Sequence, residues 1–249
     1  MTGIVVDDVW LRRFHPGRIS SPTLVCFPHA GGSASYFRPL SQALADQVNV
    51  LAVQYPGRQD RSRETCLSTI DELADAVYPA VEALVAGPIA LFGHSMGAIL
   101  AFEVATRLKQ RRAVSPLALF ASGRRAPSKR RPGENVHLLD DRDLASELGR
   151  LSGTDTRLLE DESVLRMILP PVRGDYHAIE CYVHRPGTLL DCPVIALVGD
   201  ADDSVDLAEA QAWEGHTEGE FTLHSFSGGH FYLVEAQAAV ADLIAKQLC

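Results

Sequence analysis

The sequence predicts an α/β domain built around a mostly parallel sheet. Short apolar, β-branched runs recur with helical patterns between them, and this alternation is typical of parallel sheets covered by helices. The expected strands are 23–27, 48–53, 89–92, 117–121, 194–198 and 221–226. The expected helices are 37–45, 70–85, 98–110, 207–214 and 232–246. At 249 residues the chain is long enough for one large domain, or for one domain with an insertion.

One connection is much longer than a crossover requires. About 70 residues separate the fourth expected strand from the fifth, whereas a crossover helix with its loops needs about a dozen. Leu144, Leu148 and Leu151 have the spacing of one amphipathic helix, and residues 164–169 that of another. We expect a core made of residues 1–126 and 191–249, and an inserted helical lid made of residues 127–190. The alternative to a lid is an extra structural layer with no part in substrate binding.

A serine lies between two glycines in the stretch GHSMG, Gly93 to Gly97. A buried strand precedes this stretch and a helix follows it, so the chain must turn sharply at Ser95. This arrangement is the nucleophile elbow of the α/β-hydrolase fold, which holds the serine in a strained backbone conformation at a helix N-terminus. A G-x-S-x-G stretch occurs by chance in about one chain of this length in ten, so further residues are needed.

Acyl transfer by serine needs a base, a carboxylate that holds the base, and donors for the oxyanion. In this fold the triad follows the chain order serine, acid, histidine. Of the three late histidines, His216 lies in a polar stretch and His224 inside an expected strand. His230 follows two glycines directly after the last strand, at the sheet edge where the base must lie. The sequence therefore favours His230 as the base, and a solvent-facing loop histidine is the alternative.

Three aspartates follow the expected strand 194–198 and compete for the role of triad acid. They are Asp200, Asp202 and Asp203. Spacing alone does not separate them.

A glycine-rich stretch, CFPHAGGS, follows the first expected strand. It is analogous to the glycine-rich oxyanion loops of esterases. We expect the N–H groups of Ala30 and of Met96, the residue after the nucleophile, to hold the oxyanion, and His29 to be structural. A glycine-rich turn with no catalytic role is the alternative.

Composition excludes several classes of protein. A net charge of −9 argues against general binding to nucleic acid or anionic membranes. The five cysteines are scattered and form no C-x-x-C pair, so neither a disulfide framework nor a zinc site is indicated. No apolar run approaches the 18 residues of a membrane span, and no secretory signal is recognised. We expect a cytoplasmic enzyme.

Several long motifs occur in the order found in one known family. They are WLRRFHP (10–16), CFPHAGGSAS (26–35), QYPGRQDR (54–61), FGHSMGA (92–98), SGRRAP (122–127) and GGHFYL (228–233). With these motifs the chain resembles the discrete type II thioesterases of polyketide and nonribosomal peptide synthesis. The resemblance favours Asp202 as the triad acid, with Asp200 second, because the family's acid ends a G-x-x-D motif ahead of a valine and a tryptophan. Residues 169–182 are similar to the family's LRAD region, but Gly174 replaces the usual alanine.

The resemblance implies a serine thioesterase that needs no metal or redox cofactor. Its family hydrolyses acyl groups from the phosphopantetheine thiol of acyl or peptidyl carrier proteins, which frees synthases blocked by stalled or aberrant acyl units. Ser95, His230 and Asp202 would form the triad. A carboxylesterase or a transacylase of the same fold would share this machinery, whereas a non-catalytic module would usually have lost one triad member.

One basic segment stands out in an otherwise acidic chain. It lies just before the expected lid and includes Arg124, Arg125, Lys129, Arg130 and Arg131. Carrier proteins are generally acidic and their pantetheine arm bears a phosphate, so these side chains are expected to steer docking. A solvated loop with no partner is the alternative.

Overall fold

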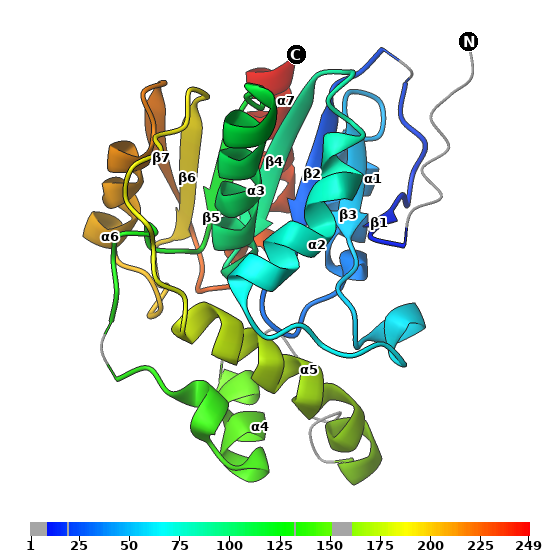
Figure 1. The fold of residues 1–249 in the computed structure, drawn as a ribbon, viewed down its shortest axis with the longest axis vertical. Coiled ribbons are helices and arrows are strands. Elements are labelled where there is room, and N and C mark those ends of the chain that lie inside the picture. The colour runs from blue at the N-terminus through cyan, green and yellow to red at the C-terminus, as the bar shows by residue number, and fades with distance from the viewer. Residues whose placement is uncertain (1–8, 19, 132, 151–160) are drawn as a thin grey trace.

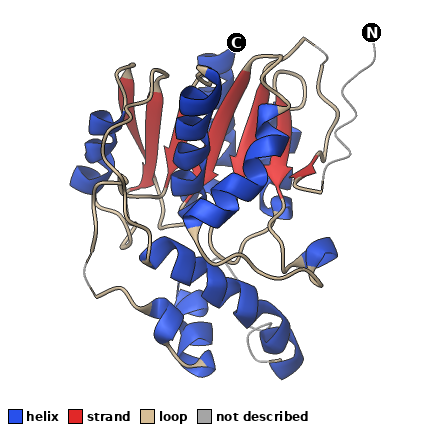
Figure 2. Ribbon diagram, in the orientation of Figure 1, coloured by secondary structure: helices blue, strands red, loops and turns tan. Residues whose placement is uncertain are grey.

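The computed structural model describes residues 9–18, 20–131, 133–150 and 161–249. A central sheet has helices on both faces, and a further helical layer lies beyond one end of it (Figures 1 and 2). The sheet has seven strands in the order β1-β3-β2-β4-β5-β6-β7. They are β1 (Leu11–Arg12), β2 (Thr23–Phe27), β3 (Asn49–Val53), β4 (Ile89–His94), β5 (Leu119–Ser122), β6 (Val194–Gly199) and β7 (Phe221–Phe226).

The prediction of a mostly parallel sheet is confirmed, and so are all six expected strands. Every pairing is parallel except that of β1 with β3. Strand β1 was not expected, because a two-residue edge strand leaves no periodic pattern in the sequence. Strands β3, β4, β5 and β6 are buried along their whole length, as continuous apolar runs in a sheet covered on both faces must be.

Alternate residues of each strand face two separate cores. Val25 and Leu51 pack in one core against α2 (Ile70–Glu82) and α3 (Met96–Arg112). Their neighbours Leu24 and Val50 pack in the other against α1 (Arg38–Leu44) and α7 (Gln237–Leu248). This two-residue period is that of a β-strand, and it places two helices on each face of the sheet (Figure 1).

In two of the expected helices, a 3₁₀ segment replaces part of the predicted range. Helix α7 begins at Gln237 and not at residue 232, because Tyr232–Val234 forms a 3₁₀ turn. The Tyr232 hydroxyl lies 2.6 Å from the Ser122 hydroxyl, and this contact holds the turn against the sheet. Helix α6 is short, Leu207–Gln211, and continues as the 3₁₀ segment Ala212–His216.

The long connection between β5 and β6 forms the predicted helices. After the 3₁₀ segment η3 (Val136–Leu138) come α4 (Asp141–Arg150) and α5 (Glu162–Glu180), which lie beyond the carboxyl ends of the strands (Figure 1). Leu144 and Leu148 pack with residues of α5 in a small core of their own. Leu151 lies outside the described residues.

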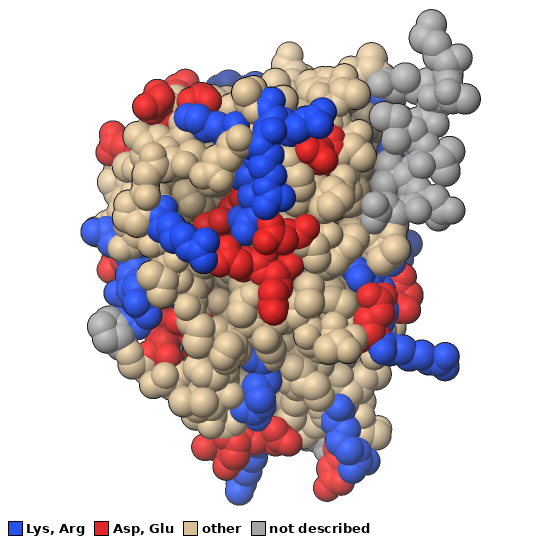
Figure 3. Space-filling model, viewed as in Figure 1, with Lys and Arg blue, Asp and Glu red and all other residues tan. Residues whose placement is uncertain are grey.

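Acidic and basic side chains are interleaved on the face that α2 and α3 cover (Figure 3). Arg107 of α3 lies at the centre of this network and pairs with Asp71, Asp75 and Glu103. The charges on this face are therefore largely paired. Within the described ranges, no helix combines the length and the apolar character needed to cross a lipid bilayer.

Candidate active site

Ser95 occupies a sharp turn between β4 and α3. Its backbone has φ 55° and ψ −119°, in the region that L-residues rarely adopt. A Cβ on Gly93 would lie 2.1 Å from the Gly97 carbonyl oxygen, and one on Gly97 would lie 2.0 Å from the Phe27 carbonyl oxygen. Only glycine fits at either position. The Ser95 N–H donates to the Ser122 carbonyl (2.8 Å), which ties the turn to β5.

The structure brings Ser95, His230 and Asp202 together in one hydrogen-bonded chain. His230 Nε2 lies 3.0 Å from Ser95 Oγ, and His230 Nδ1 lies 2.9 Å from an Asp202 carboxylate oxygen. The Asp202 side chain is fully buried, and its second oxygen accepts the Ser204 N–H. A buried carboxylate bonded to Nδ1 leaves Nε2 free to accept a proton from the serine.

The other two candidate aspartates lie elsewhere. Asp200 is exposed and accepts the N–H of Gly228 (2.9 Å), in the loop that carries His230. Asp203 is also exposed, and its carbonyl accepts from Arg131. Asp200 therefore shapes the loop without contacting the histidine ring through any described hydrogen bond.

A second serine–histidine pair lies below the elbow, and its surroundings differ. His94 Nδ1 lies 2.9 Å from Ser122 Oγ, and both residues are fully buried. The Ser122 hydroxyl is also bonded to Tyr232, and His94 Nε2 has no hydrogen-bond partner. Neither residue lines the cavity that contains Ser95. This pair therefore supports the elbow from within the core.

Two neutral histidines pack close to His230. The ring centres of His94 and His230 are 5.3 Å apart, and His29 packs against Phe231. Burial, and secondly the nearby His230, lower the pKa of His29 to about 3. The same two causes hold the pKa of His94 well below its usual range. Both neighbours of His230 are therefore neutral near pH 7, and the interpretation of His29 as structural stays a prediction.

The glycine-rich loop after β2 lies beside the elbow. Ala30 and Ser95 line the same cavity, and no described residue accepts a hydrogen bond from the Ala30 N–H. Met96 is the first residue of α3, so its N–H has no partner within the helix. Ala30 therefore lies in the cavity wall and Met96 directly follows the nucleophile, and both residues remain the predicted oxyanion donors.

A buried ion pair fixes this loop and was not foreseen from the sequence. Asp175 of α5 pairs with both terminal nitrogens of Arg58, at 2.5 and 2.9 Å, and also accepts the Gly31 N–H at 2.7 Å. Arg58 in turn donates to the Gly32 carbonyl (3.2 Å). The Asp175 side chain is fully buried and that of Arg58 is 8% exposed. Helix α5 is thus bonded directly to the oxyanion loop.

Gly174 does not open a gap beside this ion pair. A Cβ built on it would meet the Cys66 Cβ at 3.7 Å, which is ordinary contact. The alanine usual in the similar family would therefore fit without any shift, and the departure leaves the packing of α5 unchanged.

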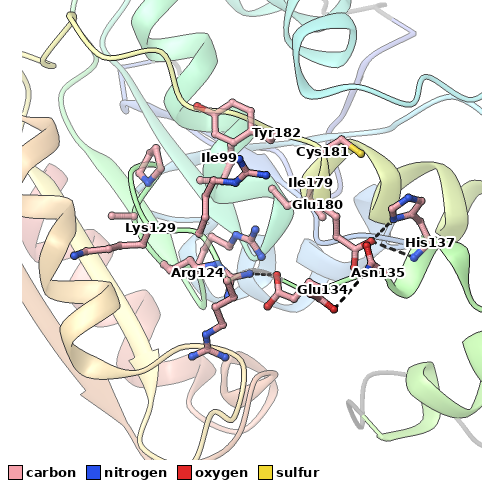
Figure 4. A pocket seen from close by; sticks show the side chains of 16 residues that line it. Ile99, Arg124, Lys129, Glu134, Asn135, His137, Ile179, Glu180, Cys181 and Tyr182 are labelled. Carbon is pink, nitrogen blue, oxygen red and sulfur yellow. Dashed lines mark hydrogen bonds and ion pairs between the residues drawn. The ribbon is translucent and has the colours of Figure 1, made fainter.

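The cavity above Ser95 is lined mainly by apolar side chains. Its volume is about 230 Å³, and the inserted helices contribute Leu148, Ile168, Val172 and Ile179. Arg124 and Ile179 also line a neighbouring cavity of about 420 Å³, and the rest of the basic segment contributes to the lining of that cavity (Figure 4). The two cavities therefore share a wall.

The basic segment is less free than its sequence indicates. Arg125 is buried and paired with Glu134, and Arg131 is paired with Glu209 at 2.6 Å. Lys129 and Arg130 are exposed and make no ion pair with any described residue. The expected patch thus reduces to two solvent-facing cations and to Arg124, which points into the shared wall.

The sheet, the elbow and the Ser–His–Asp geometry define a hydrolase of the α/β-hydrolase fold. The thioesterase domain family matches residues 22–248. The chain belongs to this family and is a thioester hydrolase.

Relatives span the whole chain. It is 51% identical over 245 residues to thioesterase PikA5 of Streptomyces venezuelae, covering 98% of this chain and 87% of the relative. Among solved structures, the type II thioesterase BorB from the borrelidin biosynthetic cluster superposes with a TM-score of 0.91 at 52% identity, covering 97% and 98% of the two chains. YbtT, a type II thioesterase from the yersiniabactin pathway, superposes with a TM-score of 0.87 at 28% identity. The match covers 96% of this chain and 98% of the YbtT chain. The predicted family is confirmed, and the carboxylesterase alternative is not favoured.

Asp175→Asn is expected to lower both stability and turnover. Removing one partner of a buried ion pair costs about 3–5 kcal/mol, and the Gly31 N–H loses its charge-assisted bond, which loosens the oxyanion loop. Urea unfolding and kcat on a small thioester measure the two effects. The double variant Arg58→Met, Asp175→Leu removes both charges and should recover stability without recovering kcat. Recovery of both would show that the pair acts through stability alone.

Stability should fall as the pH drops below about 6.5. The folded-state pKa of His29 is about 3, below the ordinary 6.5, so the unfolded chain binds a proton first and the stabilisation present above pH 6.5 is lost on acidification. One such histidine costs about 2 kcal/mol at pH 5. His29→Phe should flatten the dependence between pH 7.5 and 5 by that amount, measured by urea unfolding. Equal flattening in His224→Gln, a histidine of β7 outside the cluster, would contradict this assignment.

Proposed function

We propose that the chain releases acyl groups from the phosphopantetheine thiol of acyl or peptidyl carrier proteins, and so clears stalled or aberrant units from a polyketide or nonribosomal peptide synthase. The observation that carries this proposal is the chain of hydrogen bonds from Asp202 through His230 to Ser95, facing an apolar cavity. Relatives that are type II thioesterases support the choice of substrate. The cytoplasm, where carrier proteins are synthesised, is the proposed location.

In the first half of the reaction, Ser95 Oγ attacks the thioester carbonyl carbon and its proton passes to His230 Nε2. The N–H groups of Ala30 and Met96 hold the oxyanion that forms. The carbon–sulfur bond then breaks, and the thiol leaves with the proton from His230. Asp202 keeps the imidazole in the tautomer that accepts at Nε2 and stabilises its charged form.

In the second half, water attacks the acyl-enzyme. His230 takes a proton from the water, the same two N–H groups hold the new oxyanion, and the bond to Ser95 Oγ breaks as the proton returns to that oxygen. The products are a free carboxylic acid and the regenerated serine. Every proton is carried by His230, so no metal or redox cofactor is required for this sequence.

Residues 127–190 act as the lid of this site, and residues 1–126 and 191–249 as the core. The lid role rests on the apolar side chains that α4 and α5 contribute to the cavity above Ser95. A volume of about 230 Å³ is below the range of about 300–1,000 Å³ that is usual for ligand pockets. The site therefore favours short acyl groups.

The pantetheine arm reaches Ser95 through the cavity of Figure 4, which Lys129 and Arg130 line in part. Arg124 lies where this cavity meets the one that contains Ser95. Its Nε is buried and has no hydrogen-bond partner. The amide carbonyls of the arm are acceptors that this guanidinium can bind, whereas Lys129 and Arg130 face the acidic carrier. Arg125 and Arg131 hold the segment in place through their ion pairs.

The first test is release of free acid from a carrier protein loaded with a short acyl-phosphopantetheine. Wild type should release acid, and Ser95→Ala should lose at least 10³-fold in rate, because residual catalysis would come from binding and oxyanion donors alone. Adding an amine or alcohol acceptor tests the transacylase alternative. Acyl-enzyme that forms quickly but hydrolyses only slowly, and is consumed by the acceptor, would contradict hydrolysis as the main reaction.

Lys129→Glu with Arg130→Glu is expected to raise KM for the loaded carrier protein about tenfold at low salt while leaving a small acyl thioester unaffected, since exposed charges act through steering. The matched control reverses two exposed cations on the far helices, Arg38→Glu with Lys246→Glu. An equal rise in KM in the two double variants, or an equal rise for the carrier protein and the small thioester, would show that the basic segment has no role in carrier docking.

A further inference from the structure

Two histidines and a cysteine meet where the carboxyl end of α5 contacts the core near Ser68. His177 and Cys181 lie at the carboxyl end of α5, and His137 lies in η3. One ligand atom from each lies within 4.8 Å of the other two. Figure 4 shows His137, Glu180 and Cys181 at the end of the cavity opposite Lys129. None of the three takes part in the proposed hydrolysis.

Both imidazole rings are held in the tautomer that binds metal. His137 Nδ1 contacts the Glu180 carboxylate, and His177 Nδ1 lies 2.8 Å from the Ser68 carbonyl oxygen. A carbonyl and a carboxylate only accept hydrogen bonds, so each Nδ1 donates and each Nε2 keeps a free lone pair. Metal-binding histidines typically donate their second ring nitrogen to such partners.

The ring of His137 is fixed by contacts that need no ion. The Glu180 carboxylate also accepts the backbone N–H groups of Val136 (2.9 Å) and His137 (3.1 Å). Arg173 donates to the His137 carbonyl at 2.7 Å. The His137 and His177 rings meet edge to face, with centres 5.1 Å apart. The fold therefore holds the His137 and His177 rings in place before any ion binds.

We propose that His137, His177 and Cys181 form a binding site for a divalent cation of the zinc class. Imidazole nitrogen and thiolate sulfur are the ligands that zinc prefers. Bonds of about 2.0–2.3 Å to a tetrahedral ion place its ligand atoms roughly 3.3–3.8 Å apart, so the cluster must contract by about 1 Å. Cys181 is exposed at the helix end and can supply this movement by rotating its side chain. Binding releases the thiol proton, and water fills the fourth position.

The charges next to the cluster favour a cation, whereas the cations of the basic segment line another part of the same cavity. The carboxyl end of α5 carries the negative end of the helix dipole, and Glu180 adds a carboxylate next to His137. The nearby Arg173 is paired with Asp141 at 2.7 Å. A bound ion would join η3, which follows the basic segment, to the end of α5. It would thus clamp the insertion without contacting Ser95.

Cobalt binding to the untagged, reduced protein tests the proposal by absorption. Wild type should bind one equivalent of Co²⁺ with a thiolate-to-cobalt charge-transfer band, and one equivalent of Zn²⁺ should abolish the band. Cys181→Ser should lose the band, whereas Cys249→Ser, which removes the other exposed cysteine, should keep it. Glu180→Gln should weaken Co²⁺ binding about 10–100-fold, as the loss of such a partner typically does.

Thermal unfolding gives an independent measurement that does not depend on activity. Zn²⁺ should raise the Tm of wild type and of Cys249→Ser but not that of folded Cys181→Ser or His177→Gln. A folded wild type that shows no stoichiometric cobalt band would overturn the site. So would a band that survives in Cys181→Ser or disappears in Cys249→Ser.

Discussion

The close approach of backbone around Ser95 is the constraint on which the rest of the site depends. A non-glycine residue with positive φ costs about 1–3 kcal/mol, and it persists here because α3 lies against the end of β2 with no room for a side chain at Gly93 or Gly97. The strain is offset by the packing of α3, which is buried in the core along most of its length. Since β4, β6 and β7 run parallel, their carboxyl ends meet at one edge. Ser95, Asp202 and His230 follow those three strands, and this is why residues 135 positions apart are hydrogen-bonded.

The second constraint links the insertion to the catalytic edge. Asp175 is the only point among the described contacts at which α5 bonds to the oxyanion loop, through Gly31 and Arg58. A fully buried carboxylate is costly unless it is paired and hydrogen-bonded, and here both conditions are met. The position of α5 and the geometry of the oxyanion loop are therefore not independent. A shift of the helix would either carry the loop with it or leave a buried charge unpaired.

Local patterns in the sequence were sufficient for the sheet, the elbow and the histidine, because each depends on neighbouring residues. The acid was different. Asp200, Asp202 and Asp203 all follow the same strand, and spacing alone could not separate them, whereas the fold places only Asp202 against His230. Arg58 and Asp175 are 117 positions apart, and no periodicity links them. One signal for this ion pair was available in the sequence: Asp175 lies on the apolar side of α5, and a buried carboxylate there must be paired.

The basic segment shows why charge counted along a sequence overstates charge presented to a partner. Two of its five cations, Arg125 and Arg131, form ion pairs with Glu134 and Glu209. Arg124 differs both from the paired Arg125 and Arg131 and from the exposed Lys129 and Arg130. Burial, and secondly Arg125, lower its pKa to about 10, so it is still charged at neutral pH. Arg124 is half-buried, and its buried Nε without a hydrogen-bond partner is costly to the free protein. Under the proposed function, the amide carbonyls of the pantetheine arm are the acceptors that would offset this cost at the shared wall between the two cavities. Binding energy obtained there, away from the thioester, can position the carbonyl at Ser95.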